Sequence, residues 1–124
     1  MAVSMATTLR NNRLDQITAF AGAGAILRVY TAAYGAVLYN STCAATFAAA
    51  AAAGVLTANA IGNATATGAG TAAIARLYKS DGTTMVLEGL TVGTSGTNIV
   101  ITNTTIAVND VVTTSSATIT EGNP

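Results

Sequence analysis

The strongest constraint on the fold is a β-hairpin predicted across residues 72–92. Apolar and polar side chains alternate as far as Tyr78, a turn follows at residues 80–83, and Met85 begins the returning strand. Asp81 and Gly82 favour the reversal, because Asp bonds to the backbone just after it and Gly adopts positive φ without steric cost. The middle of the chain is therefore predicted to be β-structure.

The first strand of this hairpin has an echo earlier in the chain. Residues 25–30 read AILRVY and residues 73–78 read AIARLY, and each is followed by a Val-Leu pair. Further short strands are predicted at residues 36–39, 54–61, 97–102 and 112–120, with another candidate at 42–47, a loop or single turn at 48–53 and a loop at 62–70. Strands at this spacing are typical of a sandwich or barrel. The sequence predicts a mainly β chain, an antiparallel sandwich or barrel-like domain over residues 25–124.

Helical character is confined to the N-terminal arm, residues 1–24. Thr7 or Thr8 can cap a helix that runs to about Ala21. Five apolar residues fall on one arc of this helix: Leu9, Leu14, Ile17, Phe20 and Ala21. Five polar residues lie opposite: Asn11, Asn12, Asp15, Gln16 and Thr18.

Arg10 and Arg13 project into the apolar arc of this helix. One interpretation is that their aliphatic stems cover apolar surface while the guanidinium groups reach water. The other is that the helix packs on another subunit, where the two arginines meet carboxylates or carbonyl oxygens. The second interpretation makes Leu9, Arg10, Arg13, Leu14, Ile17 and Phe20 an interface, with the Asp81–Gly82 turn as a second contact.

Low charge restricts the partners of the chain. Charged residues are only 8% of the 124, and the net charge is zero. This disfavours nucleic acid as a partner, because nucleic-acid binding depends on clustered Lys and Arg. With few aromatic residues, the core must be built from Ala, Val, Ile and Leu, which bury little area each. Contact with protein neighbours, including copies of itself, would add stability to such a domain.

Two further features bear on location. Cys43 is the single cysteine, so no internal disulfide is possible, and a small buried thiol is the expected state. No secretory signal is evident, and no stretch reaches the roughly 18 apolar residues of a membrane-spanning helix. We therefore expect no membrane partner and synthesis in a cytoplasm.

The sequence contains few residues that could catalyse a reaction or bind a metal ion. It has no His, the commonest general base and transition-metal ligand. Its five acidic residues are scattered, and none form the alternating Asp pattern of a calcium loop. We expect no catalytic residues, metal or cofactor.

Five stretches together resemble a group of small structural proteins of tailed bacteriophages. In order, they are residues 9–14, 54–61, 76–83, 92–98 and 119–123. This resemblance implies a virion component, above all a capsid decoration (cement) protein on the capsid surface, made in the bacterial cytoplasm. The major capsid protein would then be the partner, with self-association into a homo-oligomer also expected.

Two other functions stay open. One is a tail, neck or fibre-associated virion component. The other, from a different class, is a carbohydrate- or host-binding β-sandwich, which requires exposed aromatic side chains; Tyr34 and Tyr39 are the candidates.

Overall fold

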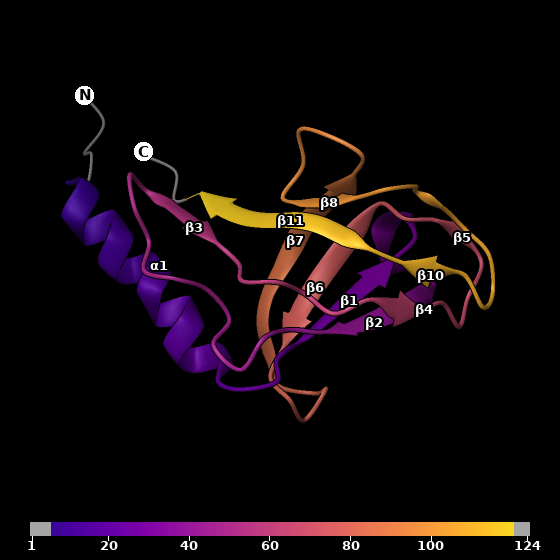
Figure 1. The fold of residues 1–124 in the computed structure, drawn as a ribbon, viewed down its shortest axis with the longest axis horizontal. Coiled ribbons are helices and arrows are strands. Elements are labelled where there is room, and N and C mark those ends of the chain that lie inside the picture. Colours follow the sequence, from indigo (N-terminus) through magenta and orange to yellow (C-terminus); the bar gives the residue numbers. More distant parts are fainter. Residues whose placement is uncertain (1–5, 121–124) are drawn as a thin grey trace.

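The computed structural model describes residues 6–120 (Figure 1). These residues form one α-helix, α1 (Thr7–Ala21), a short 3₁₀ turn, η1 (Ala32–Tyr34), and eleven strands. The strands are β1 (Ile26–Tyr30), β2 (Val37–Thr42), β3 (Val55–Thr57), β4 (Ala64–Thr65), β5 (Gly70–Thr71), β6 (Ile74–Tyr78), β7 (Met85–Gly93), β8 (Ile99–Ile101), β9 (Thr105–Ile106), β10 (Val111–Val112) and β11 (Thr114–Thr120). The prediction of a mainly β fold with one N-terminal helix is confirmed.

Seven strands form one curled sheet in the order β2-β1-β6-β7-β8-β11-β3, which makes a half-barrel (Figure 1). Two-stranded sheets, β10-β4 and β5-β9, lie at one end. Every pairing is antiparallel except that of β7 with β8, so the main sheet is mixed. The prediction of an antiparallel sheet is therefore correct for all but one of its pairings.

Asn98 links the strands on either side of the parallel β7–β8 pair. Parallel neighbours usually need a crossover of a dozen or more residues, yet here only residues 94–98 connect the strands. The Asn98 side-chain oxygen accepts hydrogen bonds from the N–H (3.1 Å) and hydroxyl (3.0 Å) of Thr91, and its amide nitrogen donates to the Thr118 carbonyl (3.2 Å). The Asn98 side chain thus joins β7 to β11 at the connection between β7 and β8.

The predicted hairpin and its echo form the centre of the sheet. β6 pairs with β7 as expected, and β1 pairs antiparallel with β6, so the two similar strands lie side by side. Leu27 faces Leu77 and Val29 faces Ala75 across this pair, and all four are fully buried. The pleat sends alternate residues to opposite faces, so the remaining residues of β1 and β6 point away from the core.

Strand lengths in the middle of the chain differ from the predictions. Residues 43–47 do not form a separate strand, since β2 ends at Thr42. The strand expected over 54–61 is only Val55–Thr57, and the loop expected over 62–70 contains β4. In both places the pairing partner sets the length of the strand. β11 pairs with only three residues of β3, and β10 pairs with Ala64 and Thr65. Residues 48–53 form a loop, as expected.

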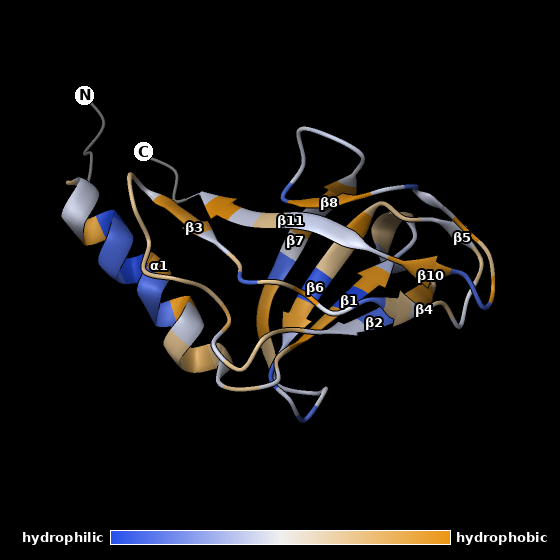
Figure 2. Ribbon diagram, viewed as in Figure 1, coloured by the Kyte–Doolittle hydropathy of each residue, from blue (hydrophilic) through white to orange (hydrophobic). Residues whose placement is uncertain are grey.

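The helix has the expected extent, but its inward face is not the predicted arc. Leu14 and Ala21 are about 1% exposed and belong to the main core cluster, whereas Leu9 and Phe20 are 49% and 50% exposed. Figure 2 shows α1 as largely hydrophilic with isolated apolar bands. The helix packs beside β3 and contacts β7. Its bonds to the 48–54 loop turn part of the predicted polar side inward, which leaves Leu9 and Phe20 outside.

No helix within residues 6–120 has the length and hydropathy needed to cross a membrane.

Candidate interaction surfaces

The six helix residues predicted as an interface are divided between two sides of α1. Leu14 is buried in the core, and Ile17 packs partly against it. Arg10 is half-buried: its Nη2 donates to the Thr7 hydroxyl (3.1 Å), and its guanidinium lies over Gly54, 2.9 Å from where a Cβ there would be. Leu14, Ile17 and Arg10 thus pack within the chain.

The other three residues form an outer helix surface, which we define as Leu9, Arg13 and Phe20. All three side chains are exposed, and they recur at intervals of four and seven residues along one side of α1. The Lys79 ammonium lies over the Phe20 ring, 4.4 Å from its centroid. A cation–π contact of this kind fixes the position of an aromatic ring that is half in water. The outer helix surface therefore exposes two large apolar side chains, Leu9 and Phe20, beside the Arg13 side chain.

The second predicted contact, the Asp81–Gly82 turn, is exposed and well ordered by hydrogen bonds. The Asp81 carboxylate accepts bonds from the N–H groups of Thr83 and Thr84, both 2.8 Å, and from the Thr84 hydroxyl at 2.6 Å. These bonds, led by that of the Thr84 side chain, lower the pKa of Asp81 to about 2. Gly82 takes φ of +73°, which explains its presence in the turn. Turn geometry alone accounts for both residues.

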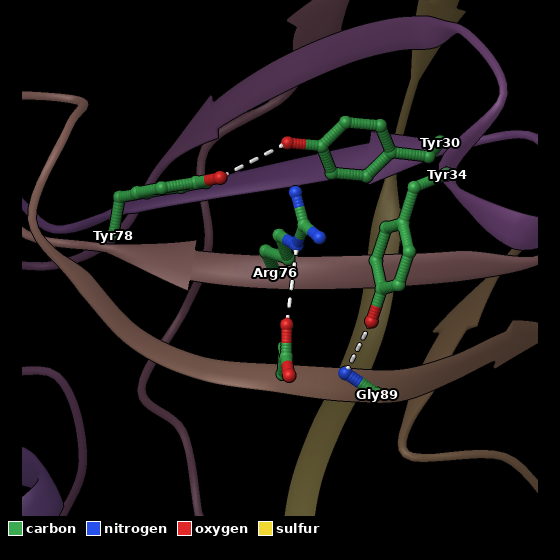
Figure 3. Close-up of polar contacts among 6 residues, drawn as sticks. Tyr30, Tyr34, Arg76, Tyr78 and Gly89 are labelled. Carbon is green, nitrogen blue, oxygen red and sulfur yellow. Dashed lines mark hydrogen bonds and ion pairs between the residues drawn. The ribbon is translucent and has the colours of Figure 1, made fainter.

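A third surface was missed by the sequence predictions. It lies on the face of β1 and β6 turned away from the core, with Tyr34 added from η1, and we call it the arginine–tyrosine face: Arg28, Tyr30, Tyr34, Arg76 and Tyr78. Figure 3 shows Arg76 and the three tyrosines. The repeated Arg-x-Tyr spacing of the two strands was the available signal, because residues two apart lie on the same face of a strand.

The contacts of this face follow an approximate two-fold pattern. Arg28 lies over the Tyr78 ring, 4.6 Å from its centroid, and Arg76 lies 5.4 Å from the centroid of Tyr30. Each arginine thus covers the tyrosine of the neighbouring strand. The two hydroxyl oxygens, of Tyr30 and Tyr78, are 3.2 Å apart and share a hydrogen bond (Figure 3).

Burial and the hydroxyl bond move the pKa values of the two tyrosines in opposite directions. Burial raises the pKa of Tyr30, whereas the hydrogen bond from Tyr30, assisted by the arginines, lowers the pKa of Tyr78. The Tyr78 hydroxyl in turn raises the pKa of Arg76. Either hydroxyl can donate the hydrogen bond that the two tyrosines share.

Tyr34 covers Arg76 from the other side. Its ring centroid is 3.8 Å from the guanidinium carbon, and its hydroxyl accepts a hydrogen bond of 2.7 Å from the Gly89 N–H (Figure 3). Ala33 and Tyr34 have φ values of 57° and 55°, a conformation that costs a non-glycine residue about 1–2 kcal/mol. The chain therefore accepts backbone strain to place the Tyr34 ring on Arg76.

Tyr39 is not a surface residue, which corrects the expectation that it is available to a ligand. It is fully buried on the core side of β2, and burial raises its pKa strongly. Its register partner Val29 also faces the core, so the pleat turns Tyr39 inward. Of the two aromatic candidates for carbohydrate binding, only Tyr34 is partly exposed, and it is stacked on Arg76.

An exposed apolar spot lies at the end of the molecule away from α1. Val108 lies in the turn before β10 and is 53% exposed; Val111 is the first residue of β10 and is 66% exposed. In Figure 1, α1 and β10 lie at opposite ends of the longest axis. Large apolar side chains are thus exposed on α1 and around β10, the elements toward opposite ends of the long axis.

The described residues hold no group of three His, Cys, Asp or Glu side chains that would suit a metal ion. Cys43 is buried, and burial raises the pKa of its thiol to about 11, so the reactive thiolate is disfavoured. Comparison of the chain with protein-family models, curated proteins and solved structures finds no match in any of the three. A function must therefore be inferred from the surfaces of the molecule.

Proposed function

We propose that this chain is a non-enzymatic structural protein of a tailed-bacteriophage virion, a capsid decoration protein that binds across major capsid subunits and stabilises the head. The observation that carries the proposal is the exposure of large apolar side chains at two separate elements, α1 and β10, which lie toward opposite ends of the long axis: Leu9 and Phe20 on α1, Val108 before β10 and Val111 in it. A protein that bridges a joint needs two separate contact surfaces, one for each subunit.

Composition favours protein partners at these two ends. Charged residues are 8% of the chain, so few charges would have to be desolvated in a contact. The resemblance of several stretches to small phage structural proteins supports the same role. Because each copy buries a modest area on two subunits, many copies together raise the free energy needed to separate them.

The first test is the number of copies of this chain in purified virions, measured by quantitative mass spectrometry against the major capsid protein. A lattice-wide decoration protein predicts hundreds of copies in a simple ratio to the capsid subunit. A dozen or fewer would place the chain at the neck or tail, the alternative virion position, and absence from the particle would overturn the proposal.

A second test asks whether the two ends make the contact. Particles that lack the chain are incubated with purified Phe20→Ser, Val111→Ser or Met85→Ser protein. Phe20 and Val111 are half or more exposed, so their replacement should leave the fold intact and lower occupancy of the particle. Met85, 44% exposed but on the central hairpin, is the matched control and should bind like the wild type. Equal binding by all three variants would argue against the two-ended contact.

A further inference from the structure

The arginine–tyrosine face has a charge arrangement that the fold alone does not balance. Arg28 and Arg76 are register partners on adjacent strands, and like charges directly opposite each other are destabilising. Arg28 donates through Nε to a neutral acceptor, the Asn40 side-chain oxygen, at 2.7 Å. Among residues 6–120, Glu88 is the one carboxylate paired with either arginine, and it lies 3.6 Å from the Nε of Arg76.

Arg76 is incompletely satisfied in this arrangement. Its Nε is buried and has no hydrogen-bond partner among the described residues, since 3.6 Å exceeds hydrogen-bond length. Arg76 therefore has one carboxylate beyond hydrogen-bond length and Arg28 has a neutral partner, although buried donors are normally paired.

Backbone strain at the same place is an independent observation. Ala33 and Tyr34 are consecutive non-glycine residues with positive φ, and the strain brings the Tyr34 ring onto Arg76. Such residues persist where surrounding contacts hold them, and they concentrate at ligand-binding sites. Stacking on Tyr34 and Tyr30 also holds the guanidinium plane, so its donors are already positioned for a ligand.

We propose that the arginine–tyrosine face is a docking site for the acidic side chain of a partner protein, whose carboxylate binds between Arg28 and Arg76. The planar guanidinium presents paired N–H donors that match a carboxylate. Arginine and tyrosine are also the residues enriched at the energetic centres of protein interfaces. Only the identity of the partner, a neighbouring protein in the virion, rests on the proposed function.

Charge favours a carboxylate on a protein over nucleic acid. Binding along a phosphate backbone takes rows of Lys and Arg, whereas this face holds two arginines beside one glutamate on a chain of zero net charge. A single acidic side chain would supply the missing negative charge without requiring more cations.

The test is an NMR titration of the purified ¹⁵N-labelled chain with three probes: a tetraglutamate peptide, a tetraglutamine peptide and sodium sulfate. The signals followed are the Nε–H groups of Arg28 and Arg76 and the backbone N–H of Gly89, which reports on Tyr34. We expect tetraglutamate to shift all three signals saturably and tetraglutamine to shift none. Sulfate should bind more weakly than tetraglutamate, because it lacks a peptide chain that can contact Tyr34, which is partly exposed beside Arg76.

Variants identify the groups responsible. Arg28→Gln and Arg76→Gln should each weaken tetraglutamate binding about tenfold, the effect of losing one charge-assisted hydrogen bond. Lys79→Gln removes the same charge at a site outside this face, beside Phe20, and should bind like the wild type. If Arg76→Gln does not fold, Arg76→Lys, which keeps the charge but loses the guanidinium, should show reduced binding in a folded protein.

Several results would overturn the proposal. They are equal shifts with tetraglutamate and tetraglutamine, tighter binding of sulfate than of tetraglutamate, shifts of the wild-type spectrum that map away from the three signals, and unchanged binding by the Arg28 and Arg76 variants. Because the titration uses the isolated chain, its outcome is independent of the copy number in virions, and failure of one proposal does not imply failure of the other.

Discussion

The carboxylate of Asp15 accepts a hydrogen bond from the backbone N–H of Ala51, with an oxygen–nitrogen distance of 2.8 Å. One helical turn earlier, the Asn11 side chain accepts the N–H of Gly54 at 2.9 Å. The intervening alanines have no polar side chains with which to satisfy the backbone. Two polar side chains of α1 therefore accept the loop's backbone N–H groups, a role that side chains within the loop would otherwise fill.

This relationship predicts that Asp15→Ala lowers the free energy of unfolding by about 1–2 kcal/mol, because a partly buried N–H loses a charged acceptor. Urea denaturation measures the loss, and hydrogen exchange at Ala51 should accelerate. Gln16→Ala, at the exposed neighbouring position, is the control and should change neither quantity. An unchanged Ala51 exchange rate in Asp15→Ala would show that the bond does not hold the loop.

Asn98→Ala should be more disruptive than an ordinary loop substitution. It removes three hydrogen bonds that join β7 to β11 across the parallel pair, and we expect a loss of about 2–3 kcal/mol in thermal or urea unfolding. Asn103→Ala removes one exposed turn bond, to the Thr105 N–H, and should cost under about 1 kcal/mol. Equal losses from the two variants would mean that the parallel pair does not depend on Asn98.

Gly68→Ala should destabilise the fold through a collision with backbone. A Cβ at this position would lie against the Val37 carbonyl oxygen, beside the point where the N–H groups of Thr67 and Gly68 both bond to Leu38. We expect a loss of about 2–3 kcal/mol. Gly22→Ala meets no atom within 4 Å but requires positive φ, so it should cost about 1 kcal/mol. A smaller loss at Gly68 than at Gly22 would contradict this account.

Stability should fall in alkaline solution because of Cys43. Its thiol pKa is about 11 in the folded chain against 9.0 ordinarily, so above pH 9 the unfolded state releases a proton that the folded state keeps. The free energy of unfolding is therefore undiminished below pH 9 and decreases by about 2 kcal/mol as the pH rises to 11. Burial of Tyr39 adds to the decrease above pH 10.

Urea titrations between pH 8 and pH 10 measure this slope. Cys43→Ala removes the thiol and should flatten the curve between pH 9 and pH 10, whatever its effect on stability at neutral pH. A slope that persists in Cys43→Ala would assign the alkaline loss to other groups.

Local chemistry explains why some elements were predictable. The hairpin of β6 and β7 follows from alternation and from Asp81 and Gly82, whose bonds and φ are satisfied within a few residues. The helix ends at Ala21 as predicted, because Gly22 follows its last turn with positive φ. The predicted cap by Thr7 or Thr8 is wrong: the residue at the N-cap is Ala6, and no side chain caps the helix there. These features need no distant partner.

Side-chain environment depended on partners far along the chain. Asp15 faces inward because the alanine loop needs acceptors, and Tyr39 is buried because β1 sets the register of β2. The arginine–tyrosine face exists because β1 pairs with β6, a choice that the similarity of the two strands does not by itself require.

The sequence by itself determined a mainly β chain with an N-terminal helix, a central hairpin and a low-charge surface, since periodicity, turn residues and composition act locally. Tertiary structure alone decided which helix side chains are exposed, how β7 and β8 pair, and that Arg28 and Arg76 stand opposite each other among three tyrosines. The physical reason is that burial and hydrogen bonding depend on which segments meet in space. The alternation of apolar and polar residues indicates that a segment is a strand, but it does not indicate which strand pairs with it.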